Sequence, residues 1–217
     1  MSSIHGMIRA MSAVPRVHLA SPADNAREIA LMLQTADEQH ADLCVFPELC
    51  LCGYTCADLL IHPPLLSGCL QALKSLLATP AHAAFVVGLP LEIGGRLYNC
   101  AVAVCGGRIL GVVPKEHLPN SGEFYEHRWF EPGHSAPNMT LLCGQEVPVG
   151  QDLVFDCGRF SFGIEICEDL WVPAPPSASL CMGGALLIAN PSASNELVTK
   201  HRYRCELISQ QSARCLC

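Results

Sequence analysis

Two spacings of apolar residues alternate along the chain and predict its helices and strands. Ile29, Leu33 and Ala36 recur at the spacing of one helical face, which predicts an amphipathic helix over residues 24–39, capped by Asp24. Short apolar runs that end at turn-forming residues are typical of buried strands. We expect strands at residues 8–13, 42–46, 83–89, 98–105, 108–113, 153–157, 159–166 and 185–189. We expect further helices at residues 65–78 and 196–213.

The pair Gly106-Gly107 predicts a β-hairpin between residues 98–105 and 108–113, because glycine tolerates the positive φ angles of a two-residue hairpin turn. The other strands alternate with helices, which indicates a layered α/β domain with a mixed sheet. Residues 116–148 form a long connection rich in proline and glycine. Long ordered loops in compact domains are often functional, so we expect this connection to contribute to a site.

The composition favours an enzyme for small molecules over a nucleic-acid-binding protein. Half of the 217 residues are apolar, 15% are charged, and the formal net charge is -7. No cluster of Lys and Arg provides the basic face that binds nucleic acid. No apolar run reaches the ~18 residues of a membrane helix, so we expect no membrane contact.

The 14 cysteines predict buried free thiols rather than a disulfide or zinc scaffold. Most lie within apolar strings such as residues 43–45 and 104–105, where a thiol behaves as a small hydrophobic group. Cys50 and Cys52 lack a second pair at zinc-finger spacing. We therefore expect a chain in the reducing cytoplasm without a metal site.

Three chemically different residues follow predicted strands. Glu48 comes after residues 42–46, Lys115 comes after residues 108–113, and Cys167 closes a third apolar segment. In α/β sheets, ligands bind beyond the carboxyl ends of the strands. The three residues together therefore favour a carboxylate–ammonium–thiol site. In it Glu48 is the general base and acid, and Lys115 stabilises an oxyanion with main-chain N–H groups that follow Cys167.

The residues around Cys167 set conditions on its reactivity. Glu165, Glu168 and Asp169 lie beside it, and uncompensated carboxylates raise the pKa of a thiol. A working nucleophile here needs a nearby cation and a base. Strand alternation also predicts two faces. The face expected under a helix layer carries Phe160, Phe162, Ile164 and Ile166, and the face expected to line a cavity carries Ser161, Gly163, Glu165 and Cys167.

Three short motifs carry a resemblance to a known family. The motifs are F-P-E-L at 46–49, V-P-K-E-H-L-P at 113–119 and I-C-E-D-L-W at 166–171. They resemble, in order and spacing, the nitrilase or carbon–nitrogen hydrolase superfamily, whose Glu–Lys–Cys triad cleaves amides and nitriles. The resemblance implies an α-β-β-α sandwich with mixed sheets. Glu48 resembles the family's base, Lys115 its oxyanion lysine and Cys167 its nucleophile.

Longer strings narrow the resemblance to the glutamine-hydrolysing region of glutamine-dependent NAD synthetases. These strings occupy residues 50–60, 118–130, 190–196 and 211–215, and the similarity extends from Gly6 onward. It implies L-glutamine as substrate and no cofactor for the amidase step. It also implies that Glu126 supports Lys115, with Glu123 as a second candidate for that task. The positions that match the glutamine-binding residues are Glu168, Trp171, Ser192 and Ser194.

The sequence departs from this family in two places. Ser121 stands where the family commonly has a tyrosine, which bears on the affinity for glutamine. The expected carbon–nitrogen hydrolase domain occupies residues 1–217, and the resemblance implies further strands beyond Cys217, so this domain is expected to be incomplete. The family's synthetase domain, which binds ATP and Mg²⁺ through an S-G-G-x-D-S loop, is also absent. The family resemblance further implies a homo-oligomer in which that domain is a partner.

Three alternatives remain open at this stage. The chain could be a free-standing amidase of the same superfamily that acts on another small amide. It could also be an inactive interaction or ammonia-gating module, because an incomplete fold exposes sheet edges and apolar surface. A papain-like Cys–His site with His127 or His134 is a third reading, although such nucleophiles begin a helix after a different motif.

Overall fold

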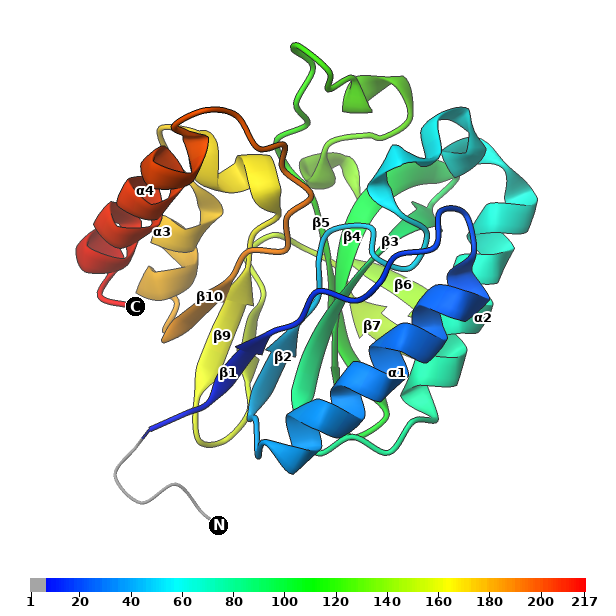
Figure 1. Ribbon diagram of the computed structural model, residues 1–217, viewed down its shortest axis with the longest axis horizontal. Coiled ribbons are helices and arrows are strands. Elements are labelled where there is room, and N and C mark those ends of the chain that lie inside the picture. The colour runs from blue at the N-terminus through cyan, green and yellow to red at the C-terminus, as the bar shows by residue number, and fades with distance from the viewer. Residues whose placement is uncertain (1–6) are drawn as a thin grey trace.

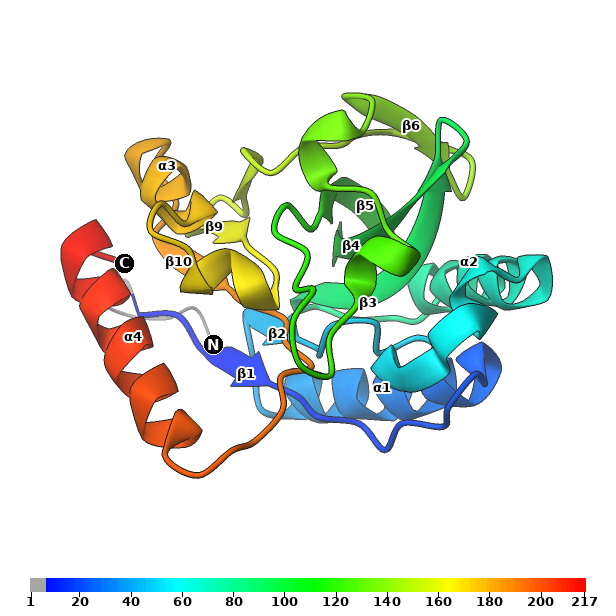
Figure 2. The ribbon, with the colours of Figure 1, turned by 90° about the horizontal axis from the view of Figure 1, so that it is seen from above.

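Two β-sheets pack face to face, and helices cover their outer faces, as Figure 1 and Figure 2 show for this computed structural model. The structure describes residues 7–217; residues 1–6 lie outside the described part. One sheet is covered by α1 (Pro22–Glu38) and α2 (Pro63–Leu77), and the other by α3 (Pro176–Met182) and α4 (Lys200–Cys215). The four layers are the α-β-β-α sandwich that the family resemblance implied.

The larger sheet has five strands in the order β1-β2-β3-β4-β5. The pairs β1/β2 and β2/β3 are parallel, whereas β3/β4 and β4/β5 are antiparallel, so the sheet is mixed as expected. Its strands are β1 (Ala10–Ser12), β2 (Leu43–Val45), β3 (Ala84–Ile93), β4 (Arg96–Cys105) and β5 (Arg108–Pro114). The smaller sheet has the order β10-β9-β8, with β8 (Val154–Asp156), β9 (Ser161–Ile164) and β10 (Leu187–Ala189).

Strands β3 and β4 separate two hydrophobic layers. Their large side chains, such as Phe85 and Val102, pack with α1 and α2. Their small side chains, such as Ala101 and Ala103, face the other sheet and meet Phe162. Successive residues of a strand point to opposite faces, so one apolar run fills both layers. This arrangement brings the two sheets close enough to share one site.

Two glycine pairs turn the antiparallel part of the larger sheet. Gly106 and Gly107 have φ values of 55° and 74° and join β4 to β5, as the sequence predicts. Gly94 and Gly95, with φ values of 60° and 77°, make an equivalent turn between β3 and β4. Because of this second turn, β3 continues to Ile93, beyond the expected end of the strand at residue 89.

Other sequence-based expectations need correction. Helix α1 begins at Pro22 with Ser21 as its N-cap residue, so Asp24 lies in the first turn, where it accepts a hydrogen bond from the Ser21 hydroxyl. The long connection after β5 is more structured than expected. It contains the 3₁₀ helices η2 (Glu126–Arg128) and η3 (Gly133–Ser135) and the hairpin of β6 (Met139–Leu142) and β7 (Gln145–Pro148). Helix α3 and the 3₁₀ helices η1 (Tyr54–Ile61) and η4 (Cys167–Trp171) were not predicted.

The two faces of β9 are covered in the opposite way to the one expected. Phe162 and Ile164 face the larger sheet rather than a helix layer. Gly163 lies under α3 instead of lining a cavity, because its lack of a side chain leaves room for Leu180. Glu165 accepts a hydrogen bond from the main chain of Ser177 at the start of α3, with an N–O distance of 2.9 Å. The alternation of side chains along the strand correctly predicts which residues share a face of β9. It does not specify whether a helix or the other sheet covers that face.

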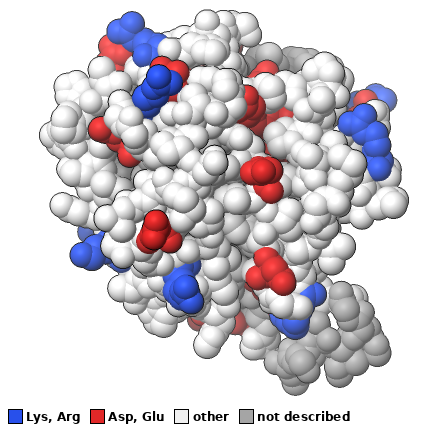
Figure 3. All heavy atoms as spheres, turned by 180° about the vertical axis from the view of Figure 1, so that it is seen from behind, with Lys and Arg blue, Asp and Glu red and all other residues white. Residues whose placement is uncertain are grey.

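The cysteines and the surface charges agree in part with expectation. All 14 cysteines are free thiols, and seven of them are buried, whereas Cys205 is exposed. On the face in Figure 3, lysine and arginine side chains are scattered among acidic ones and form no basic patch. Among the described helices, none is long and apolar enough to cross a membrane.

Candidate functional site

Glu48 is held where β2 leaves the larger sheet. The turn formed by Pro47, Glu48 and Leu49 lies against Gly88 of β3, where a Cβ atom would be 2.4 Å from the main-chain nitrogen of Leu49. Leu49 itself has a φ of 50°. Only glycine at position 88 permits this close approach. The turn therefore points the Glu48 side chain inward, where its exposed fraction is 2%.

Lys115 joins two buried carboxylates in one ion network. Its Nζ atom donates to Glu48 Oε1 at 2.7 Å and to Glu126 Oε1 at 2.6 Å. Burial alone lowers the pKa of Lys115, but the two carboxylates outweigh it and raise that pKa. Burial raises the pKa of Glu126, although Lys115 opposes this shift. The structure thus brings together three of the residues singled out from the sequence, and Glu126 is no solvated loop charge.

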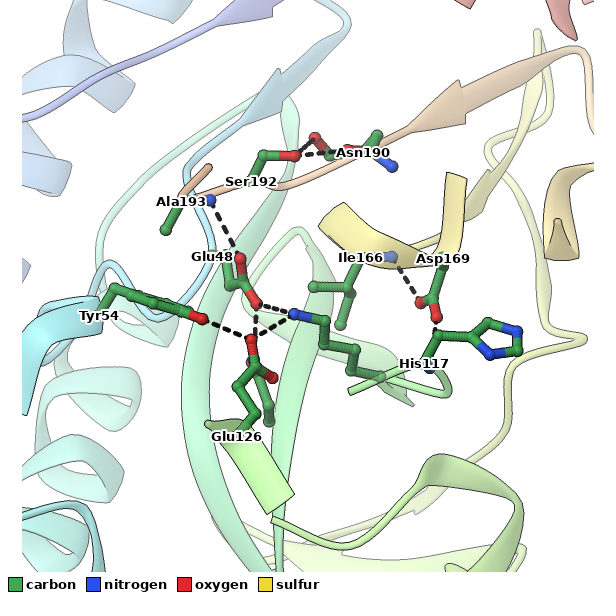
Figure 4. A network of polar contacts seen from close by, with 11 residues as sticks. Glu48, Tyr54, His117, Glu126, Ile166, Asp169, Asn190, Ser192 and Ala193 are labelled. Carbon is green, nitrogen blue, oxygen red and sulfur yellow. Dashed lines mark hydrogen bonds and ion pairs between the residues drawn. The ribbon is translucent and has the colours of Figure 1, made fainter. Parts of the chain in front are cut away.

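Three further groups complete this network, and Figure 4 shows Tyr54 directed toward Glu126 and Ala193 toward Glu48. The Tyr54 hydroxyl donates to Glu126 Oε1 at 2.6 Å. Asn99 Nδ2 donates to Glu48 Oε1 at 2.7 Å, and the Ala193 N–H donates to Glu48 Oε2 at 3.0 Å. Sequence reasoning missed Asn99, although a single amide within the apolar strand β4 was a usable signal. The carboxylates are therefore fixed in place by donors on all sides.

Cys167 lies beside this network in an unusual backbone conformation. Its φ of 47° is in the left-handed region, which is uncommon for a residue with a side chain and often found at functional sites. Its N–H donates to the carbonyl of Pro191 at 3.1 Å. Its side chain is buried, with an exposed fraction of 6%. Cys167 begins η4 rather than ending β9, so the turn and not the strand fixes its direction.

Burial, followed by the charge of Glu48, raises the pKa of the Cys167 thiol to about 12, and Lys115 acts in the opposite direction. The sequence analysis expected a raised pKa, but from the carboxylates adjacent in sequence. The charges that act on it come instead from Glu48, Lys115 and Glu126. The resting thiol is thus protonated at neutral pH, and attack on a substrate requires a base.

The papain-like alternative does not fit this arrangement. His127 is exposed, and His134 pairs its Nδ1 atom with Glu116 Oε1 at 2.6 Å. In the described part of the chain, no hydrogen bond joins Cys167 to a histidine. We therefore reject the Cys–His reading.

Asp169 is a second functional candidate that the sequence analysis did not select. Its side chain is buried, with an exposed fraction of 1%. Oδ1 accepts a hydrogen bond from the His117 N–H at 2.7 Å, and Oδ2 accepts one from the Ile166 N–H at 2.9 Å (Figure 4). Burial raises the pKa of Asp169 to about 7. Its carboxylate is therefore bonded to two segments that also carry the predicted site residues.

The residues expected to bind glutamine differ in exposure and in their contacts. Trp171 stacks on Tyr203 with ring centroids 5.4 Å apart. Ser192 donates to Asn190 Oδ1 at 2.6 Å, which agrees with a turn serine as well as with a binding residue. The partly buried members of this set are Glu168, Trp171, Ser192 and Ser194, and Ser121 is exposed.

Glu123 does not take part in holding Lys115. It is exposed and accepts a hydrogen bond from the Asn195 side chain. The ion pairs of Lys115 run to Glu48 and Glu126 instead. The second candidate for the supporting task is therefore not placed to perform it.

Two cavities lie near these residues. The smaller, of about 100 Å³, is lined by Tyr54, Glu123 and Phe124 among others, and Tyr54 connects it to the ion network. A larger one, of about 480 Å³, is lined by Glu116, His117 and residues of the β7 to α3 region, and by none of the residues predicted for the site. Within residues 7–217, no group of three or more His, Cys, Asp or Glu side chains is placed to hold a metal ion.

Comparisons with known proteins agree on one family. A sequence model of the carbon-nitrogen hydrolase family matches residues 10–215. The chain is 39% identical over 217 residues to the glutamine-dependent NAD(+) synthetase of Mycobacterium tuberculosis, and the match covers 98% of this chain and 32% of that protein. The chain thus spans about a third of the length of such curated relatives.

Solved structures show the same fold. The glutamine-dependent NAD(+) synthetase from Cytophaga hutchinsonii superposes with a TM-score of 0.86 at 28% identity, over 97% of this chain and 34% of that chain. An amidase from Nesterenkonia sp. superposes with a TM-score of 0.77 at 19% identity, over 99% of this chain and 75% of that chain. The second likeness concerns the fold alone.

Proposed function

Because this chain belongs to the carbon-nitrogen hydrolase family, we propose that it cleaves the side-chain amide of L-glutamine with Cys167 as the nucleophile. The observation that carries the proposal is the buried Lys115–Glu48 ion pair, with an N–O distance of 2.7 Å, whose charges act on the Cys167 thiol. A carboxylate, an ammonium and a thiol in one desolvated site supply a base, an electrostatic stabiliser and a nucleophile.

Glu48 acts first, as the general base. The buried thiol keeps its proton at neutral pH, because its pKa is about 12. Proton transfer to Glu48 must therefore accompany attack of sulfur on the amide carbon. A new S–C bond forms, and the amide C=O becomes a tetrahedral oxyanion. Asn99 and Ala193 hold the Glu48 carboxylate in one orientation for this step.

Lys115 stabilises the oxyanion. An ammonium group has three N–H donors, and Lys115 gives two of them to Glu48 and Glu126. The third is left for the developing charge on the substrate oxygen. Glu126, which Tyr54 holds in turn, keeps the ammonium group aimed and charged.

The intermediate then breaks down in two steps. Glu48 returns its proton to the nitrogen, the C–N bond breaks, and ammonia leaves a thioester on Cys167. Glu48 next takes a proton from the water that attacks the thioester carbon. The C–S bond then breaks, Glu48 returns the proton to the departing sulfur, and glutamate and the free Cys167 thiol are released. All proton transfers use one carboxylate, and the amidase step uses no other reactant than water.

The choice of glutamine rests on relatives that are named for it. Glutamine-dependent NAD(+) synthetases from several organisms match most of this chain, at 39% identity for that of Mycobacterium tuberculosis. We propose that the released ammonia serves, as in a synthetase of that kind, the amidation of nicotinic acid adenine dinucleotide to NAD⁺. The partner in that second reaction is an ATP- and Mg²⁺-dependent synthetase domain, and a homo-oligomer remains our expectation.

The test replaces Cys167 with alanine and measures ammonia release from glutamine. Alanine keeps the backbone constraint of a residue with a Cβ atom, so Cys167→Ala should fold and lose turnover completely. Cys205→Ala is the matched control, because that thiol is exposed on α4. A glutamine-like electrophile should react covalently with Cys167 faster than with any other cysteine. Mass spectrometry of peptides should therefore detect the added mass first on the peptide that contains Cys167. Retained turnover in Cys167→Ala would remove Cys167 from the mechanism.

A substrate panel tests the choice of glutamine separately. Glutamine should be hydrolysed faster than asparagine and than simple aliphatic amides. If another small amide is preferred, the chain is a different amidase of the same family. If neither turnover nor labelling of Cys167 is observed, the interaction-module reading replaces the enzymatic one.

A further inference from the structure

Asp169 links the segment that follows Lys115 to the segment that precedes Cys167. It accepts a hydrogen bond from the His117 N–H at 2.7 Å and another from the Ile166 N–H at 2.9 Å. His117 lies two residues after Lys115, and Ile166 directly precedes Cys167. The first segment leaves β5 of the larger sheet, and the second leaves β9 of the smaller sheet. One carboxylate thus connects the strand ends of both sheets.

Within residues 7–217, no ion pair involves the side chain of Asp169. Its exposed fraction is 1%, and its two hydrogen bonds are to main-chain N–H groups. Among the charged groups around it, Lys115 favours the ionised carboxyl and Glu165 disfavours it. The facing segment carries two further titratable side chains, those of Glu116 and His117. Hydrogen bonds to a charged acceptor are about twice as strong as neutral ones, so ionised Asp169 is the form that ties the segments together.

We propose that Asp169 is a positioning residue that sets the distance between Cys167 and Lys115, and that only its ionised form holds the two segments in register for attack on an amide. An ionised carboxylate accepts with both oxygens, whereas a protonated one presents an O–H group in place of one acceptor. Protonation therefore turns one of the two N–H contacts into a donor–donor contact. This inference rests on the proposed amide hydrolysis and adds to it the group that keeps nucleophile and cation in place.

The variant Asp169→Asn tests the proposal, because asparagine has the same shape but offers only one acceptor oxygen. We expect kcat to fall on the order of 100-fold, since a misplacement of about 1 Å has that effect, with little change in KM. Activity of the unaltered protein should also decrease as the pH falls through about 7, where Asp169 gains a proton. Asp169→Asn should lack this decrease, because it has no proton to gain.

Glu165→Gln is the matched control. Glu165 is also a buried carboxylate that accepts from a main-chain N–H, but its donor is Ser177 of α3, not a residue next to Lys115. This variant should keep the kcat of the unaltered protein above about pH 7 and keep the decrease of activity at lower pH, with its midpoint moved downward because a charge that disfavours ionised Asp169 is removed. Equal loss in both variants would mean a merely structural role for Asp169. An unchanged kcat and pH profile in Asp169→Asn would also overturn the proposal.

A second measurement needs neither activity nor a variant. In the unaltered protein, the amide proton resonances of His117 and Ile166 should shift together during an NMR titration, with a shared midpoint near the Asp169 pKa of about 7. Separate midpoints, or no shift at either amide, would overturn the proposal even if Asp169→Asn fails to fold. If glutamine is not hydrolysed but the His117 and Ile166 main-chain resonances titrate together, the proposed substrate is wrong. The proposed link between the two segments through Asp169 is then still supported.

Discussion

The two sheets satisfy their buried carboxylates in different ways. Glu48 and Glu126, at the larger sheet, share the ammonium group of Lys115. Asp169 and Glu165, at the smaller sheet, accept hydrogen bonds from main-chain N–H groups, and the side chains of Ser177 and Asn190 also act on Glu165. The first pair loses its counter-charge if Lys115 is replaced. The main-chain donors of the second pair remain when a side chain elsewhere is replaced.

This difference indicates different tasks for the buried carboxylates of the two sheets. A carboxylate next to a buried cation can exchange protons with a substrate, because the network compensates its change of charge. A carboxylate held by the main chain fixes the positions of the segments that donate to it. We therefore assign the proposed chemistry to the carboxylates of the larger sheet and the proposed positioning to Asp169 of the smaller sheet. Cys167, the proposed nucleophile, follows a strand of the smaller sheet, and Glu48, its proposed base, follows a strand of the larger one.

The largest effect is expected from Glu48→Gln, which removes the base but keeps the size of the side chain. A general base contributes about 10²–10⁴-fold to the rate, so kcat for glutamine hydrolysis should fall by that factor. The measurement is steady-state ammonia release, with circular dichroism to verify folding. Glu92→Gln, at an exposed position of β3, is the control and should have unchanged kcat. A smaller loss than tenfold in Glu48→Gln would assign proton transfer to another group.

The next effect is expected where the sheets touch. Phe162 of β9 is fully buried against small residues of the larger sheet. Phe162→Ala should decrease the free energy of unfolding by about 3–5 kcal/mol, the usual cost of such a cavity. Ile208→Ala, on the exposed part of α4, should change it by less than about 0.5 kcal/mol. Chemical denaturation measures both values, and equal values would contradict the packing described for the sheet interface.

The smallest expected effect is on the pH dependence of the free energy of unfolding, to which the buried carboxyl group of Asp169 contributes. The folded protein keeps a proton on Asp169 up to about pH 7, whereas an unfolded chain releases it near ~3.9. The folded state thus binds more protons between these values, so this group lowers the free energy of unfolding as the pH rises through that window. The slope for one group is at most about 1.4 kcal/mol per pH unit. Denaturation of Asp169→Asn should show a flatter dependence than the unaltered protein; an identical slope would contradict the raised pKa.

The sequence predicts the apolar framework and the strand ends well, for a physical reason. Strand runs such as residues 42–46 and 108–113 are local patterns, and the residue after each run must lie at the edge of the sheet. Glu48 and Lys115 could therefore be placed near one another without knowledge of the fold. The role of each remains a prediction, since contact alone does not establish chemistry.

What the sequence did not predict depends on contacts between distant segments. Asn99 and Asp169 become site residues only when the two sheets pack, and Ala193 contributes a main-chain group that no side-chain pattern reveals. Helix α3 has only seven residues, too few for a helical period to emerge. The cover on each face of β9 was likewise set by the space at Gly163, which becomes visible only with Leu180 in place.

The left-handed conformation of Cys167 has a consequence for the history of such a domain. A φ of 47° costs less conformational free energy for glycine or asparagine than for cysteine. A cysteine at this position therefore lowers the stability of the folded protein. A descendant that no longer cleaved amides would be free to lose this strain. A relative with glycine or asparagine at the position of Cys167 would then be a pseudoenzyme that has the same α-β-β-α sandwich but does not cleave amides.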